Sequence, residues 1–136
     1  MRFLGLDIGS RRIGVAISDE TALIASPYGV ISRTSIKNDV QEIITIAVEK
    51  RCGAVVLGYP LGLDGKKNSS TRLVDLFYNS LKESFQGEIF FIDERFTTKL
   101  AQQALISGNV RRSERKKTVD KVAAALILQS YLDSLR

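Results

Sequence analysis

The stretch FLGLDIGSRRIGVAISD, residues 3–19, is the most informative part of this sequence. It holds two apolar runs separated by Gly-Ser-Arg-Arg, a spacing that predicts strands over 2–9 and 13–19 joined as a hairpin. The first run carries Asp7, although a strand with so few polar positions is typical of the buried centre of a sheet. An ionised carboxylate is costly to remove from water, so Asp7 needs a cationic partner.

Beyond the hairpin, apolar residues change between strand and helix spacing. Further strands are predicted at 27–32, 54–58 and 89–92. Helices are predicted over about 35–47, 73–85 and 97–107, and from 119 onward after a basic loop. The order of three strands followed by alternating helices and strands predicts an α/β fold, with a mixed sheet and helices packed on its faces.

Size and composition limit the possible classes of protein. A chain of 136 residues with 44% hydrophobic content suits a single domain, 1–136. No apolar run reaches the roughly 18 residues of a membrane span, and the start lacks a signal-peptide pattern. One cysteine, Cys52, and no histidine exclude an internal disulfide and catalysis through histidine. We therefore expect a cytoplasmic protein with no membrane partner.

The positive charge is concentrated in one segment. Residues 95–121 hold eight of the 20 basic residues but two of the 15 acidic ones. Such a segment is typical of a surface that binds nucleic-acid phosphates, although a solvated surface loop explains it equally well. The candidate nucleic-acid-binding residues are Arg11, Arg12, Lys99, Arg111, Arg112, Arg115, Lys116 and Lys117.

Acidic residues fall where the predicted sheet would bring them together. Asp7 lies late in the first strand, and Asp93 and Glu94 end the last one. Ligands of open α/β sheets gather at the carboxyl ends of parallel strands. Side chains alternate along a strand, so only one of Asp93 and Glu94 is expected to face the Asp7 side. Asp120 shares a helix side with small residues such as Ala124, which would let it approach Asp7.

Three carboxylates in one place repel one another, and a hard divalent cation would resolve the conflict. Two such ions can stabilise both the attacking and the leaving oxygen of phosphodiester cleavage. Each acid also has a structural explanation. Asp7 could pair with Arg11 or Arg12, the acids at 93–94 could form a surface ion pair or a helix cap, and Asp120 could complement a helix dipole.

Four motifs occur here in the order seen in the YqgF family, which the chain resembles over almost its whole length. They are DIGSRRIGVAISD (7–19), VVLGYPLGLDG (55–65), FIDERFTT (91–98) and VDKVAAALILQSYLD (119–133). The family is similar to the RuvC-type resolvases. The resemblance implies an RNase H-like fold, with five strands of which the first three are antiparallel, and helices on both faces. It also implies that Asp7, Glu94 and Asp120 are catalytic and bind Mg²⁺ or Mn²⁺.

The resemblance implies a nuclease that processes the 5′ end of precursor 16S ribosomal RNA, with Holliday junction resolution as the alternative. The sequence does not decide between RNA and branched DNA, or between a monomer and a homodimer. A second class is an RNA-binding module without catalysis. A third is an ATP-binding domain, because GLDIGS (5–10) looks like the phosphate loop of actin-like kinases. The loop at 58–69 is, however, not a Walker motif.

Overall fold

The structure, a computed structural model, describes residues 1–94 and 112–136, and the side chains of 1–94 and 119–136. Five strands form one sheet in the order β3-β2-β1-β4-β5. The first three strands pair antiparallel, and β1, β4 and β5 pair parallel, which confirms the predicted mixed sheet. The strands are β1 (Arg2–Ile8), β2 (Arg12–Ser18), β3 (Ala25–Ser32), β4 (Cys52–Tyr59) and β5 (Glu88–Asp93).

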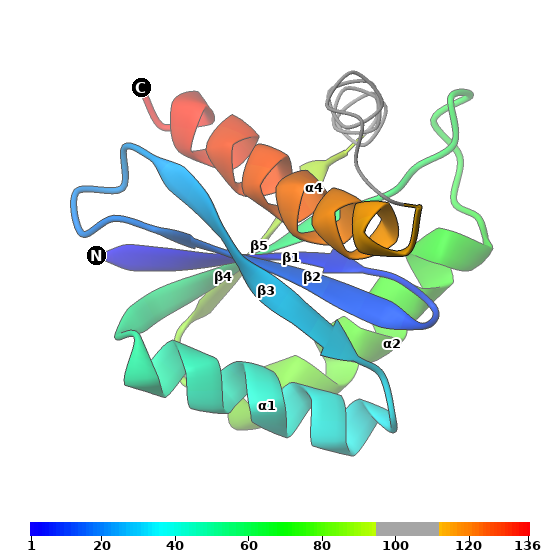
Figure 1. Ribbon diagram of the computed structural model, residues 1–136, viewed down its shortest axis with the longest axis horizontal. Helices are drawn as coiled ribbons and strands as arrows, with labels where there is room; N and C mark the ends of the chain where they lie inside the picture. The colour runs from blue at the N-terminus through cyan, green and yellow to red at the C-terminus, as the bar shows by residue number, and fades with distance from the viewer. Residues whose placement is uncertain (95–111) are drawn as a thin grey trace.

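Helices cover both faces of this sheet (Figure 1). On one face lie α1 (Ile36–Glu49) and α2 (Ser69–Ser84). Each begins at a polar side chain that accepts hydrogen bonds from the first helical turn, Ser35 for α1 and Asn68 for α2. The opposite face carries α4 (Arg112–Ser134), which crosses β1, β2 and β3.

The central strands are apolar on both faces because each face has its own hydrophobic layer. Leu4 and Leu6 point toward α1 and α2, and Phe3 points toward α4. Both leucines have no exposed surface, and burial of one such side chain contributes roughly 1.5–3 kcal/mol. The same alternation places Asp7 on the α4 face of the sheet.

Glycines let α4 lie directly on the strands. Gly5 on β1, Gly14 on β2 and Gly58 on β4 all face this helix. A Cβ atom at Gly14 would overlap the carbonyl oxygen of Asp120, and one at Gly5 would lie 2.6 Å from Leu128 Cβ. Gly14 is also the register partner of Asp7. The close contact of α4 with Gly14 therefore carries Asp120 to the neighbourhood of Asp7.

One predicted boundary is wrong. The segment before residue 119 was expected to be a loop, but α4 already begins at Arg112, so Arg112, Arg115, Lys116 and Lys117 have a helical backbone. Apolar periodicity marks only the part of a helix that is packed, whereas arginine, lysine and glutamate extend a helix without any apolar signal. The helix predicted over 97–107 lies outside the described residues. None of the helices that are described is long and apolar enough to cross a membrane.

Candidate active site

Two carboxyl groups meet at the carboxyl end of the parallel strands. Asp7 is the last but one residue of β1, and Glu94 directly follows β5. The Glu94 backbone N–H donates to the Tyr59 carbonyl at 3.2 Å, which holds the chain against β4. The Glu94 side chain lies over Gly58, where a Cβ atom would overlap its carboxylate. Glu94 thereby reaches Asp7, and the two carboxyl groups share a hydrogen bond.

Burial and mutual repulsion make these two groups hard to ionise together. Desolvation, followed by the charge of Asp120, raises the pKa of Asp7 from 3.8 to about 6. Desolvation, followed by the charge of Asp7, raises the pKa of Glu94 from 4.5 to about 8. The shared hydrogen bond lowers the pKa of Asp7 and raises that of Glu94, so the two carboxyl groups titrate as one coupled pair. At neutral pH the pair holds about one proton between them.

Asp120 lies near this pair, but its own contact is with an arginine. The Nε atom of Arg12 donates to Asp120 Oδ2 at 2.5 Å, which joins the start of β2 to α4. The side chains are 31% and 23% exposed, so water reaches the contact. Within the described residues no ion pair joins Asp7 to Arg11 or Arg12, so Asp120 is the acid that Arg12 neutralises.

The donor set suits a hard cation. Asp7 and Glu94 offer carboxylate oxygens, which Mg²⁺ and Mn²⁺ prefer, and their raised pKa values show that two negative charges are unfavourable here unless they are neutralised. In the part of the chain that the structure describes, no three acidic side chains already form a ligand cluster. The charge of Asp120 acts on Asp7, which makes Asp120 the candidate third ligand, although its carboxylate contacts Arg12.

Asp93 does not belong to this group. It lines a pocket on the other face of the sheet, next to Tyr59 and Phe91. The alternation of side chains along β5 predicts this separation, and the structure places Glu94 as the acid beside Asp7.

A buried ion pair supports the turn between β1 and β2. Gly9 N–H donates to the Arg12 carbonyl at 2.9 Å, and a Cβ atom at Gly9 would lie 2.8 Å from that oxygen. Arg33 donates to the Gly9 carbonyl at 3.0 Å and, through Nε, to Asp39 at 3.0 Å. Asp39 is 1% exposed. Neither Arg33 nor Asp39 was expected to be functional, because an acid in the first turn of a helix is explained by the helix dipole alone.

The predicted phosphate-binding residues are only partly described. Arg11 is exposed on the turn beside Asp7, and Arg12 contacts Asp120. Lys99 and Arg111 lie outside the described residues. The remaining four basic residues are described as helical backbone at the start of α4.

Two solved structures of resolvases have the same architecture. Thermus thermophilus RuvC, in complex with a Holliday junction substrate, has a TM-score of 0.58 at 16% identity, over 97% of this chain and 96% of that one. The fowlpox virus resolvase, in complex with Holliday junction DNA, has a TM-score of 0.59 at 17% identity, over 99% of both chains. These similarities confirm the RNase H-like fold of the RuvC-type nucleases.

Sequence relatives are much more similar. A Clostridium tetani protein named "Putative pre-16S rRNA nuclease" is 44% identical over 135 residues, which span 99% of this chain and 98% of that protein. A Trichormus variabilis protein with the same name is 42% identical over 133 residues, 98% of this chain and 88% of that one. Residues 1–134 match the family model RuvX, described as Holliday junction resolvase. The chain therefore belongs to the RuvX (YqgF) family.

Proposed function

We propose that this protein is a divalent-metal-dependent endonuclease of one domain that acts on structured nucleic acid and processes the 5′ end of precursor 16S ribosomal RNA. Its family and the names of its relatives make it a phosphodiester-cleaving hydrolase. The observation that carries the proposal is the buried Asp7–Glu94 pair at the carboxyl end of β1 and β5, with Asp120 beside it. The named function of the 42–44% identical relatives supports precursor 16S ribosomal RNA as the target.

We assign Asp7, Glu94 and Asp120 as the ligands of Mg²⁺ or Mn²⁺. A bound divalent cation would supply a water nucleophile at neutral pH and stabilise the leaving oxygen. The protein's own contribution is positional. The sheet holds Asp7, the contact of Glu94 N–H with Tyr59 holds Glu94, and the packing of α4 on Gly14 holds Asp120.

Basic residues around these acids would bind the phosphates on either side of the cleaved bond. Arg11 lies on the turn that follows β1, and Arg12 is the first residue of β2. Such contacts position nucleic acid without reading its sequence, and they make binding strongly dependent on salt. We assign the same role to Lys99, Arg111, Arg112, Arg115, Lys116 and Lys117.

A second candidate is resolution of Holliday junctions in DNA, which the description of the family model favours. A resolvase cuts two strands symmetrically and would act as a homodimer, whereas RNA end processing requires only a monomer. A third candidate, an RNA-binding module without catalysis, would need only the basic residues.

Cleavage of two labelled substrates separates these candidates. One is precursor ribosomal RNA across the processing site, and the other is a four-way DNA junction, each tested with Mg²⁺, Mn²⁺ or a chelator. We expect metal-dependent cutting of the RNA. Asp7→Asn should reduce the cleavage rate by more than the roughly 10–100-fold that is lost when a group that only orients a metal ligand is removed. Binding of the RNA should persist.

Asp64→Asn is the matched control, because Asp64 is exposed and, among the described residues, accepts only a local hydrogen bond from Lys66 N–H. Cutting of the junction alone would assign the protein to recombination. Binding of both substrates without cutting of either would favour the binding module.

A further inference from the structure

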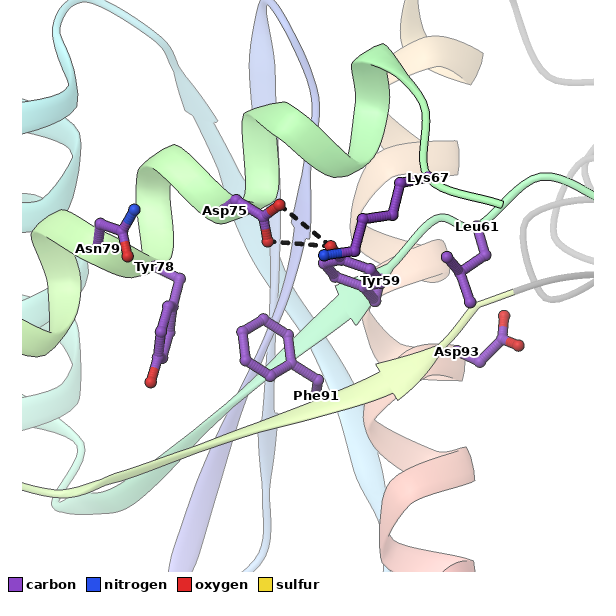
Figure 2. A pocket seen from close by; sticks show the side chains of 8 residues that line it. All are labelled: Tyr59, Leu61, Lys67, Asp75, Tyr78, Asn79, Phe91 and Asp93. Atoms are coloured by element: carbon purple, nitrogen blue, oxygen red, sulfur yellow. Dashed lines mark hydrogen bonds between the residues drawn. The ribbon is translucent and has the colours of Figure 1, made fainter. Parts of the chain in front are cut away.

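A second site lies on the face of the sheet opposite Asp7. An open pocket of about 650 Å³ is bounded by β4, β5, α2 and the loop after β4 (Figure 2). Pockets for small ligands have roughly 300–1,000 Å³, so this one has room for a single ring system and its substituents. The hydrolytic site does not use any of the side chains that line it.

Aromatic side chains form the base of this pocket. Phe91 on β5 is 41% exposed, although it is surrounded by other rings. The Tyr59 ring meets it edge-on at 5.5 Å, and the Tyr78 ring lies 4.9 Å from it, with an angle of 60° between the planes. The Tyr59 hydroxyl donates to the Asp75 carboxylate, with oxygen distances of 3.0 and 3.1 Å, which fixes that ring. A fixed and partly exposed aromatic group is the usual platform for an unpaired nucleobase.

Polar groups around the rings match the rest of a nucleotide. The Lys67 ammonium lies 5.9 Å from the centre of the Tyr59 ring and can reach a backbone phosphate. The amide of Asn79 offers both a donor and an acceptor for a base edge. Asp75 and Asp93 disfavour a free polyphosphate in the pocket, but carboxylates accept hydrogen bonds from the amino groups of bases.

The pocket and the hydrolytic site lie back to back on the same strand ends. Gly58 underlies the Glu94 carboxylate, while its neighbour Tyr59 lines the pocket. Likewise Glu94 contacts Asp7, while its neighbour Asp93 lines the pocket. A single strand that crosses the carboxyl ends of β4 and β5 would therefore have a phosphate on one face and a base on the other.

We propose that this pocket binds one unstacked base in a single-stranded RNA segment next to the cleaved phosphate, an inference that rests on the proposed function and narrows its substrate. A base within a duplex arm is stacked and paired, so it cannot enter without the cost of extrusion. The pocket thus favours a substrate with a single-stranded flank over a fully paired four-way junction.

The test measures binding in an Asp7→Asn background, so that cleavage does not enter. The probes are an RNA hairpin with a single-stranded tail that carries 2-aminopurine, and the same hairpin without a tail. Phe91→Ala and Phe91→Leu should each weaken binding of the tailed hairpin about tenfold, or 1.4 kcal/mol, because both remove stacking. Binding of the blunt hairpin should not change.

Leu76→Ala is the matched control, because Leu76 is 44% exposed on α2 and lies outside the pocket. Full affinity of Phe91→Leu for the tailed hairpin would overturn the proposal, as would an equal loss on both hairpins. The two proposals fail separately. If the Phe91 variants lose binding of the tail but the protein with Asp7 intact cuts no RNA, the pocket proposal stands and the nuclease proposal is rejected. If the protein cuts RNA but the Phe91 variants bind the tail normally, the nuclease proposal stands and the pocket proposal is rejected.

Discussion

Arg12 lies between the acidic residues of the candidate active site and the turn where phosphates are expected. Its guanidinium neutralises Asp120, whose charge would otherwise add fully to the repulsion at Asp7. The same guanidinium lies at the start of β2, next to the turn where phosphates are expected. A phosphate that draws Arg12 away would leave the Asp120 carboxylate available to a cation, so we expect nucleic acid and metal to favour each other's binding.

The Arg12→Gln variant tests this linkage. Without nucleic acid, removal of the guanidinium should strengthen Mn²⁺ binding about two- to fivefold, the equivalent of a partly exposed ion pair of up to about 1 kcal/mol. Titration of the free protein with Mn²⁺ measures the effect. Arg11→Gln is the control, since this substitution removes a similar charge next to Arg12, and the ion pair of Asp120 is with Arg12. Unchanged or weaker Mn²⁺ binding by Arg12→Gln would contradict the linkage.

Single residues could be predicted where one local rule decides their position. The alternation of side chains in a strand placed Glu94 and Asp93 on opposite faces, but only the family resemblance indicated that Glu94 is the one beside Asp7. The partner of Arg12 could not be predicted, because Asp120 is 108 residues away and Asp7 is five. Only the docking of α4 on the sheet chooses between the two acids, and that docking depends on packing across several elements.

At the scale of elements, the position of α4 determines the geometry of the site. The helix meets the sheet backbone through the glycines of three strands. Its other end is held by Gln129, which accepts from Ala25 N–H and donates to the Leu23 carbonyl, both at 2.9 Å. These contacts leave the helix little freedom to shift along the strands. A substitution at one of the glycines should therefore change the position of Asp120.

Gly14→Ala should therefore affect both stability and catalysis. Its Cβ atom would overlap the Asp120 carbonyl oxygen, so α4 must move outward, at a cost of about 1–3 kcal/mol of unfolding free energy. The same shift moves Asp120 away from Asp7 and should lower cleavage. Gly29→Ala on β3 is the control, because a Cβ atom there meets nothing within 4 Å. Urea unfolding measures the stability, and an equal effect of both variants would reject the explanation.

The elements themselves could largely be predicted from apolar spacing. The five strands and the helices α1 and α2 were found from the spacing of their apolar residues, although the edge strands β3 and β5 bury little of their surface. The start of α4 was placed seven residues too late, because its first turns are polar and their backbone conformation depends on local propensity alone. The glycines at 5, 14 and 58 explain the close approach that alanines alone had suggested.

At the scale of the whole molecule, the acids at the strand ends oppose folding at neutral pH. The folded protein holds protons on Asp7 and Glu94 up to pKa values of about 6 and 8, whereas the unfolded chain releases them near 3.8 and 4.5. Between these limits the folded state binds more protons than the unfolded state. The free energy of unfolding must therefore fall as the pH rises through this window.

Thermal melts in chelator from pH 5 to pH 8 test this expectation. Each pH unit should lower the stability by up to about 1.4 kcal/mol per carboxyl group. The lowered pKa of exposed Asp19 acts only in more acidic solution and leaves the window unaffected. Glu94→Gln should flatten the slope, because it removes the group with the higher pKa, and Mg²⁺ should flatten it by replacing the protons with a cation. Stability that rises with pH in chelator would show that the two carboxylates ionise freely. The argument that a cation is needed to neutralise them would then be wrong.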